Sequence, residues 1–492
     1  MAQLCVTIGA PTLADLRERR DKAARDADLV ELRLDMVADP DVAGALAGRT
    51  GPVIVTCRAS WEGGHFRGSE QTRLQLLHEA WAMGAEYVDI EFAAFKGAPW
   101  VEATHGERLI VSAHDFDGVP GDLAERHRAI CATGASVTKL SITAHGLRDV
   151  ARLAALARPA TGKQVLLAMG TPGLVTRIAP GRFGSAWTYA GDAWAPGQIS
   201  ASRLRDEFRF SEISDRVALY GVAARPSGHS MSPVMHNAAF RAAGLDAVYV
   251  PLEALDAADL FEFADSLDVR GASVTIPFKT EVLPRCEPDA ASRAAGAVNT
   301  LVRRDGRWLG RNTDIAGLLA PLAGRFRLTG SRVTILGAGG AARAAALACA
   351  GAGAIVTVCA RRRAQAADVV GAAGGSIGAF PPERGSWDLL INTTPVGMQP
   401  VTDATPMPAS HLDGRLVYDL IYNPPETRLL RDAREAGLET LGGLDMLVAQ
   451  AEAQFEIWTG QPAAPGVMRA AADRRLRTLM APTQPAPTGS LS

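Results

Sequence analysis

Lysine is scarce in this chain. Among its 492 residues 51 are basic, and only five of these are lysines: Lys22, Lys96, Lys139, Lys163 and Lys279. Arginine does not lose its proton at useful pH, whereas lysine can act as a Schiff-base nucleophile or a proton donor. Lys139 and Lys279 each follow an apolar, β-branched run, at 135–139 and 272–279. General depletion of lysine in an Ala- and Arg-rich sequence is the alternative explanation, but these positions suggest two reactive amines.

The sequence also lacks the features of disulfide-rich, zinc-binding, nucleic-acid-binding and membrane proteins. The six cysteines are scattered with no CxxC pair, which favours reduced, mostly buried thiols over a disulfide framework or a zinc site. The net charge of −2 gives no reason to expect a nucleic-acid or membrane partner. No secretory leader or bilayer-spanning apolar run is evident. We therefore expect a cytoplasmic protein that acts on small molecules and holds no metal, with a disordered tail at 481–492 and an undetermined oligomeric state.

The first part of the chain, residues 1–210, alternates strand-like runs with helical patterns such as 69–84 and 120–132. Eight β/α units in series predict a (β/α)₈ barrel, an α/β fold. The alternative is an open doubly wound sheet, but no glycine-rich phosphate loop follows the first strand. The expected strands are 4–10, 29–36, 52–58, 86–92, 108–114, 135–141, 164–169 and 183–189.

A second α/β pattern follows a polar junction at 208–216. Its first unit covers 217–313, and the turn dipeptide Asp305-Gly306 predicts a hairpin within it. A Rossmann-like unit at 315–442 follows. The helical segment 445–459 could pack on either unit, and we assign 445–480 to the first.

Polar residues interrupt the apolar strands of the predicted barrel near their carboxyl ends, where barrel active sites lie. Glu31, Arg33 and Asp35 alternate and so face one side, and we interpret Asp35 as part of a buried salt bridge. Arg58 ends the third strand and His114 the fifth.

Lys139 lies in the sixth expected strand, and three arginines are expected around it: Arg33, Arg58 and Arg177. Like charges would disfavour its ammonium and so favour imine formation with a ketone. The same arginines could bind an anionic substrate. His114 has the chemistry of a proton shuttle near neutral pH.

This half resembles type I 3-dehydroquinate dehydratase. The motifs, in order, are Glu31-Leu-Arg33, Arg58 with Glu62-Gly-Gly, Ser112-Ala-His114-Asp-Phe, Lys139-Leu, Thr176-Arg177 and Ala195-Pro-Gly-Gln198. The resemblance implies that Lys139 forms an imine with the substrate ketone and that His114, oriented by Glu62, moves the protons. It further implies that the substrate carboxylate and ring substituents are bound by Arg177, Glu31, Arg33, Arg58 and Gln198. Trp194 departs from the family, which commonly has serine there.

A glycine-rich loop in the second half, Gly337-Ala-Gly339-Gly340-Ala341, follows a strand and opens a helix. That context suits a dinucleotide pyrophosphate. The next strand, 354–360, is followed by Arg361, Arg362 and Arg363 rather than a carboxylate, which favours NADP over NAD. The alternative is a solvated basic helix start, which the helix dipole opposes.

The second half resembles shikimate dehydrogenase over 217–480. The motifs are Gly228-His-Ser230-Met-Ser232-Pro, Ser273-Val-Thr275-Ile-Pro-Phe-Lys279, Ala297-Val-Asn299-Thr, Gly310-Arg-Asn312-Thr-Asp314, Asn392-Thr-Thr-Pro-Val-Gly-Met398 and Leu447-Val-Ala-Gln450. The resemblance implies that Lys279 and Asp314 form the catalytic pair. It places further residues around a shikimate-like ring, namely Ser230, Ser232, Thr275, Asn299, Tyr422 and Gln450, and others at the cofactor, namely Thr393, Met398 and Gly443. Ser273 and Ala360 replace asparagines found in many family members.

The two resemblances together predict a bifunctional shikimate-pathway enzyme. The barrel would dehydrate 3-dehydroquinate to 3-dehydroshikimate, and the second half would reduce this product to shikimate with NADPH. One alternative is a catabolic quinate/shikimate dehydrogenase that uses NAD. Another is a ligand-sensing regulator built from degenerate enzymes, which both retained lysines disfavour.

Overall fold

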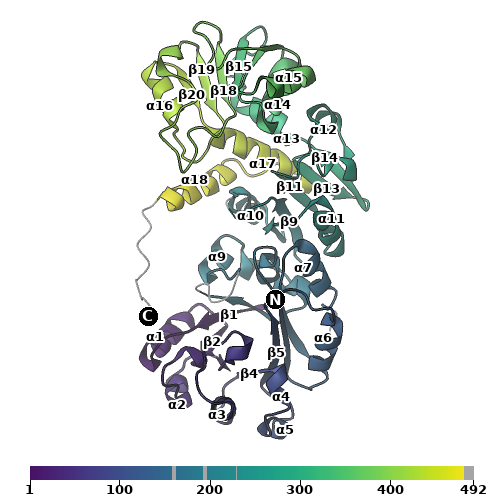
Figure 1. Cartoon of the computed structure of the whole chain (residues 1–492), viewed down its shortest axis with the longest axis vertical. Helices are drawn as coiled ribbons and strands as arrows, with labels where there is room; N and C mark the ends of the chain where they lie inside the picture. The colour runs from purple at the N-terminus through teal and green to yellow at the C-terminus, as the bar shows by residue number, and fades with distance from the viewer. Residues whose placement is uncertain (158–161, 192–196, 229, 481–492) are drawn as a thin grey trace. The chain divides into compact units, whose positions relative to one another are not determined.

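The structure of the chain is a computed structural model that describes residues 1–157, 162–191, 197–228 and 230–480 (Figure 1). It divides into two compact units, each described here by itself. The first contains Met1–Pro233 and Asp246–Arg270, and the second contains Val234–Leu245 and the chain from Gly271 onward. No helix within the described ranges is long and apolar enough to cross a membrane. All six cysteines are free, and four of them are buried.

An eight-stranded parallel sheet forms the body of the first unit, with the strand order β7-β6-β5-β4-β3-β2-β1-β8. A single parallel bridge between Gln164 and Ser185 links the two ends, so the sheet forms a nearly closed barrel, as predicted. The strands are β1 (Gln3–Ile8), β2 (Leu29–Arg33), β3 (Val53–Thr56), β4 (Tyr87–Glu91), β5 (Leu109–Asp115), β6 (Val137–Thr143), β7 (Lys163–Met169) and β8 (Trp187–Ala190).

The eighth strand begins at Trp187, later than the expected residue 183. Pro180–Phe183 instead form the 3-10 turn η3, which ends at Gly184 with φ +63°. Proline fixes φ at the start of this turn, and glycine accepts the left-handed conformation at its end. The chain therefore enters the strand only after the turn is complete.

Helices follow the barrel strands and cover the sheet, because parallel strands need crossover connections. Strand β3 is buried along its whole length, as expected for a sheet covered on both faces. Side chains cap several helices, for example Thr12 at α1 and Ser69 at α3. The helices are α1 (Leu13–Ala23), α2 (Val42–Leu46), α3 (Glu70–Ala82), α4 (Phe92–Phe95), α5 (Trp100–Ala103), α6 (Leu123–Cys131), α7 (Leu147–Ala154), α8 (Leu174–Ile178) and α9 (Ala201–Asp206).

The first unit continues beyond the barrel. Strands β9 (Ala218–Ala223) and β10 (Ala247–Leu252) pair in parallel, and α11 (Ala257–Ser266) packs against barrel helix α7. Helix α10 (Ser232–Ala242) lies between these strands in the chain. Part of the second α/β pattern is therefore in direct contact with the barrel.

The second unit opens with four neighbouring strands in the order β11-β13-β14-β12. Strands β13 (Thr300–Arg304) and β14 (Arg307–Arg311) form the predicted hairpin, and Asp305 and Gly306 at its turn have φ of +50° and +76°. Positive φ at both turn positions is the signature of the hairpin turn expected from Asp-Gly. The remaining elements are β11 (Gly271–Val274), β12 (Glu287–Pro288), α12 (Ala290–Ala295) and α13 (Thr313–Leu319).

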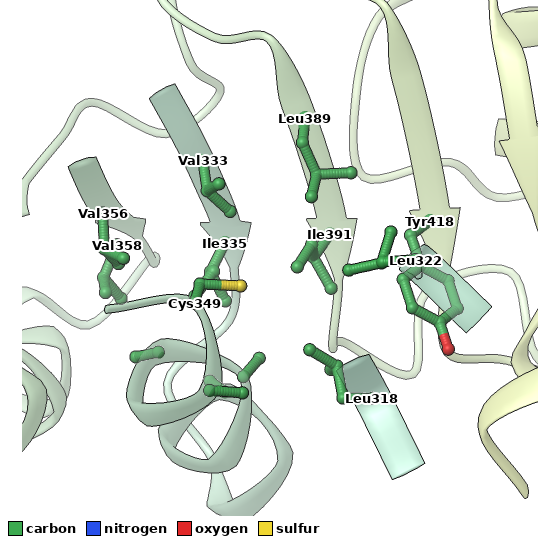
Figure 2. Packing of buried hydrophobic residues seen from close by; sticks show 14 of the residues in the cluster. Leu318, Leu322, Val333, Ile335, Cys349, Val356, Val358, Leu389, Ile391 and Tyr418 are labelled. Carbon is green, nitrogen blue, oxygen red and sulfur yellow. The ribbon is translucent and has the colours of Figure 1, made fainter. Parts of the chain in front are cut away.

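A six-stranded parallel sheet, in the order β17-β16-β15-β18-β19-β20, forms the Rossmann-like part of the second unit. Alternate residues of β15, β16 and β18 contribute to one buried cluster beside α13 and α14 (Figure 2). The strands are β15 (Arg332–Leu336), β16 (Ile355–Cys359), β17 (Ser376–Ile377), β18 (Leu389–Asn392), β19 (Leu416–Asp419) and β20 (Glu439–Leu441). The helices are α14 (Gly340–Gly351), α15 (Arg363–Ala373), α16 (Arg428–Glu435), α17 (Gly443–Thr459) and α18 (Val467–Met480).

Candidate active sites

A cavity of about 120 Å³ opens in the barrel, and every residue predicted for the first site lines it. These residues are Glu31, Arg33, Arg58, Glu62, His114, Lys139, Arg177 and Gln198. They come from three strands, β2, β5 and β6, and from segments that follow strands, so only the closed sheet brings them together. Trp194 and the Ala195-Pro part of its motif lie outside the described residues.

Lys139 on β6 is buried, with 5% of its surface exposed. Its Nζ lies 2.9 Å from Asp89 Oδ2 and 3.5 Å from Glu31 Oε1. The expectation of a lysine surrounded by arginines is therefore incomplete, because two carboxylates face the ammonium directly. Glu31 is itself held by the hydroxyls of Thr7 and Thr56, at 2.7 and 2.9 Å.

Asp89 on β4 is a site residue that the sequence argument missed. Its carboxylate also accepts hydrogen bonds from Arg58 and Ser112, at 2.9 and 2.6 Å. Burial opposes its ionisation, but Arg58 and Lys139 outweigh burial and hold the pKa of Asp89 far below its usual value. Arg58 is therefore paired with a carboxylate of the protein, which leaves less of its positive charge available to bind an anionic ligand.

A second carboxylate, Glu91, extends this network. It accepts from Arg58 at 3.1 Å and from Arg73 of α3 at 2.7 Å. Asp89 and Glu91 alternate in an otherwise apolar strand, the same signal that drew attention to Glu31 and Arg33. That alternation could have identified both residues, although not their partners.

His114 at the end of β5 is paired with Glu62. The Nδ1 atom of its ring lies 2.7 Å from Glu62 Oε1, which also accepts the His114 backbone amide at 3.0 Å. Burial, with Arg58 and Lys139 nearby, lowers the pKa of His114 well below its usual value, so the ring is neutral at pH 7. Burial raises the pKa of Glu62 to about 7, although Arg58 opposes the shift.

Glycine geometry lets Glu62 reach His114. Gly63 has φ +74°, and a Cβ at Gly64 would lie 2.0 Å from the carbonyl oxygen of Arg58. Only glycine permits this close return of the chain over the end of β3. In the Glu62-Gly-Gly motif, Glu62 therefore supplies the carboxylate, and the two glycines allow the backbone turn that brings it to His114.

Arg33 and Arg177, the other two predicted arginines of the barrel site, differ in their partners. Arg33 forms two hydrogen bonds with the buried carboxylate of Asp35, at 2.8 and 2.7 Å, which confirms the predicted salt bridge. Arg177 on α8 is 2% exposed, and burial lowers its pKa to about 10. Its Nη1 donates to the carbonyl of Ala168 at 2.6 Å. A buried cation lining a cavity is suited to binding an anion there.

The second unit holds the other predicted catalytic pair. Lys279 Nζ lies 2.6 Å from Asp314 Oδ2, and both side chains are partly exposed. Asn299 donates to Asp314 Oδ1 at 2.8 Å and to Thr313 at 2.9 Å. The structure therefore joins three predicted residues into one hydrogen-bonded group; they come from the loop after β11, the position just before β13 and the first turn of α13.

Other predicted substrate residues are distributed over both units. Gln450 of α17 packs on Gly317 of α13, the helix that carries Asp314, where an added Cβ would lie 2.7 Å from Gln450 Cβ. Thr275 and Tyr422 are partly buried in the same unit. Ser230 and Ser232 lie in the first unit, where the Ser232 amide donates to Ser230 Oγ at 3.2 Å.

The glycine loop has the shape expected for a phosphate-binding turn. Gly337 has φ +110°, and Gly339 is the N-cap of α14 without a side-chain cap. No atom lies within 4 Å of a Cβ built at Gly339 or Gly340, so open space faces the helix N-terminus. Because such a terminus binds anions, this space fits a dinucleotide pyrophosphate.

The other residues predicted to bind the cofactor differ in their contacts and in their exposure. Thr393 donates to the carbonyl of Leu336 at 2.6 Å, and a Cβ at Gly337 would lie 2.5 Å from its hydroxyl. A Cβ at Gly443 would lie 2.2 Å from the carbonyl of Leu420. Ala341 and Met398 are exposed. Arg361, Arg362 and Arg363 are all exposed at the N-terminus of α15.

Comparison with known families assigns the two halves of the chain to the same two families that their motifs resemble. Residues 4–215 match the family model for type I 3-dehydroquinase. Residues 222–301 match that for the shikimate dehydrogenase substrate binding domain, and residues 443–472 that for the shikimate 5'-dehydrogenase C-terminal domain. Among the described residues, no group of His, Cys, Asp and Glu side chains is placed to hold a metal ion.

Individual relatives support the same division. A bifunctional 3-dehydroquinate dehydratase/shikimate dehydrogenase of Arabidopsis thaliana, named as chloroplastic, is 34% identical and covers 94% of this chain and 82% of its own. An NADP(+) shikimate dehydrogenase of Halorubrum lacusprofundi is 43% identical over 51% of this chain and 97% of its own. A crystal structure of shikimate dehydrogenase in complex with NADP+ is similar with a TM-score of 0.51 at 34% identity, covering 54% of this chain and 97% of that one.

Proposed function

The chain belongs to the family of bifunctional 3-dehydroquinate dehydratase/shikimate dehydrogenases, and we propose that it catalyses both reactions in sequence. The barrel, within residues 1–210, converts 3-dehydroquinate to 3-dehydroshikimate. The segments 217–313 and 445–480 bind that product, and 315–442 binds the NADPH that reduces it to shikimate. The observation that carries this proposal is that each candidate lysine lies beside ionisable partners, Lys139 in the barrel cavity and Lys279 against Asp314.

In the dehydratase reaction Lys139 Nζ, once deprotonated, adds to the substrate ketone, and the ketone oxygen leaves as water. Asp89 and Glu31, at 2.9 and 3.5 Å, lie close enough to stabilise the charge on nitrogen during this change. His114 then removes the proton from the neighbouring carbon, and the electron pair moves to the imine nitrogen. The returning pair expels the ring hydroxyl, which leaves as water with the proton from His114, and hydrolysis releases Lys139.

His114 is suited to this role because its lowered pKa keeps the ring neutral and able to accept a proton. Glu62 at 2.7 Å fixes the ring through Nδ1, which leaves Nε2 for the substrate. Arg177 holds the substrate carboxylate, and the ring substituents contact Glu31, Arg33, Arg58 and Gln198. These contacts place the ketone against Lys139 before reaction.

In the dehydrogenase reaction Lys279 donates a proton to the ketone oxygen as negative charge develops there. Asp314 holds the ammonium at 2.6 Å, and Asn299 fixes the other oxygen of that carboxylate. Further contacts with the substrate ring come from Ser230, Ser232, Thr275, Tyr422 and Gln450. NADPH, when bound, supplies the hydride.

The cofactor is proposed from the open glycine turn and the exposed arginines. Gly337, Gly339, Gly340 and Ala341 surround the space for the pyrophosphate, and Arg361, Arg362 and Arg363 offer guanidinium groups for a 2′-phosphate. Thr393, Met398 and Gly443 would complete the cofactor site. The free cysteines support a reducing compartment, for which we propose the cytoplasm.

A coupled assay tests the proposal directly. The intact chain should oxidise NADPH when given 3-dehydroquinate alone. Lys139→Ala should abolish this activity but retain NADPH oxidation with 3-dehydroshikimate, and Lys279→Ala should form 3-dehydroshikimate but not oxidise NADPH. An intact, folded chain that performs neither step would show the proposal to be wrong.

A further inference from the structure

An aromatic ring lies against the amine of Lys139 in the barrel. The Nζ atom is 4.4 Å from the centroid of the Tyr189 ring, and both residues line the cavity. A cation within about 6 Å of an aromatic face is attracted by the electron density of the ring. Tyr189 lies on β8 and Lys139 on β6, so the barrel rather than the local sequence makes this contact.

The ring of Tyr189 is held in place by the apolar interior of the barrel. Tyr189 is 5% exposed and belongs to a buried cluster that includes Cys5, Leu29 and Trp187. The Trp187 ring packs edge-on at 6.4 Å between centroids. Because β-strand residues two apart share a face, Trp187 and Tyr189 both point into the barrel. The ring therefore offers Lys139 a fixed surface.

Charged groups surround the same amine from other strands. Asp89 and Glu31 pair with it directly, Asp89 is shared with Arg58, and His114 and Cys5 lie near enough to interact with it electrostatically. The carboxylates stabilise any positive charge on the nitrogen. The ring adds a contact that does not depend on the ionisation of another acid.

We propose that Tyr189 is a positioning residue for the dehydratase reaction, whose ring face holds the Lys139 nitrogen and stabilises the positive charge of its protonated imine. This inference rests on the proposed function of the barrel. The neighbouring carbon loses its proton only after the protonated imine has formed, so a ring that favours this imine raises the fraction of bound substrate ready for that step. The ring, not the hydroxyl, carries the effect.

The test compares two substitutions in the full chain. Tyr189→Leu removes the ring and should lower the dehydratase kcat by about 3- to 30-fold, as expected for a partly desolvated cation–π contact, with KM for 3-dehydroquinate changed little. Tyr189→Phe keeps the ring and should restore kcat to within about 2-fold of the wild type. Borohydride trapping of the imine at saturating 3-dehydroquinate should slow in the leucine variant in proportion to kcat.

Val165→Ala is the matched control, because Val165 is fully buried in the same cluster and does not line the cavity. It should lower the melting temperature without changing kcat. If Tyr189→Leu turns over at the wild-type rate, or Tyr189→Phe is as slow as Tyr189→Leu, the inference is overturned. Absence of imine trapping at Lys139 in the wild type would instead overturn the proposed function itself.

Discussion

The Asp259 carboxylate accepts a hydrogen bond of 2.7 Å from the backbone amide of Arg148, which lies 111 positions earlier in the chain. The same carboxylate accepts from the amides of Leu147 and Leu255, at 3.0 and 2.8 Å. Barrel helix α7 begins after Gly146, which has no side chain to cap it. A residue from α11, outside the barrel, therefore caps a barrel helix, and the two halves are structurally linked although their predicted sites share no residue.

We expect Asp259→Ala to destabilise the chain. Three backbone amides would lose a buried acceptor, at a cost of roughly 2–4 kcal/mol in the free energy of unfolding. Thermal unfolding followed by circular dichroism should show a clearly lower melting temperature. Glu262→Ala is the control, because it removes only an exposed partner of Arg148 and should have little effect. An unchanged melting temperature for Asp259→Ala would show that the link contributes nothing.

His114→Ala should separate proton transfer from imine formation. Without the base, turnover of 3-dehydroquinate should fall by at least ~10²-fold. Lys139 keeps Asp89 and Glu31 as partners, so borohydride should still trap the substrate on it. Mass spectrometry of the trapped adduct measures this outcome. Complete loss of trapping would mean that His114 is needed to build the cavity rather than to move the proton.

The stability of the chain should depend on pH through Glu62. Its pKa is about 7 in the folded chain, against an ordinary value of 4.5. Between these values the folded state keeps a proton that the unfolded state has lost, so the free energy of unfolding falls as pH rises from about 4.5 to 7. Relative to the wild type, Glu62→Gln should therefore be more stable at pH 8 than at pH 5, and the free energy of unfolding should show a difference of about 2.5 kcal/mol.

Urea unfolding at the two pH values measures this difference. Glu79→Gln is the control, because Glu79 is exposed on α3 and its replacement should give similar differences at both pH values. Glu62→Gln should also slow the dehydratase, since the amide holds His114 less firmly than a carboxylate. Equal stability differences at pH 5 and pH 8 would contradict the assigned titration of Glu62.

Cofactor preference should depend on the arginines that begin α15. Two charge-assisted hydrogen bonds to a 2′-phosphate, at about 1.5–3 kcal/mol each, predict a preference for NADPH over NADH on the order of 10²-fold or more. The preference should appear in KM rather than in kcat, because the phosphate lies far from the transferred hydride. Replacing both Arg361 and Arg362 with alanine should remove most of it without altering shikimate binding.

Arg327→Ala provides the control, since Arg327 is also exposed but lies in the loop before β15. Steady-state kinetics with both cofactors decides the outcome. Efficient use of NADH by the wild-type chain would contradict the role given to the arginines and would favour the catabolic quinate/shikimate dehydrogenase.

The periodicity of the sequence was enough to predict much of the fold. All eight barrel strands are present, although several differ from their expected ends; β2, for example, ends at Arg33 rather than at residue 36. The hairpin at Asp305-Gly306 and the glycine turn before α14 are confirmed. Each depends on local chemistry, because strand burial and glycine conformation are properties of short segments. The start of β8 was misplaced because apolar residues near 183 pack in a 3-10 turn, and hydrophobicity alone does not distinguish such a turn from a strand.

The residue types required at each site were likewise contained in the sequence, including Lys139, His114 and Glu62 in the barrel and Lys279 with Asp314 in the second half. Only the tertiary structure decided which groups face them. Asp89 reaches Lys139 because β4 and β6 are separated by a single strand, and Tyr189 reaches it across the barrel interior. Asp259 likewise reaches α7 only because α11 packs there. Such long-range pairs depend on sheet order and closure, for which no short stretch of sequence carries a signal.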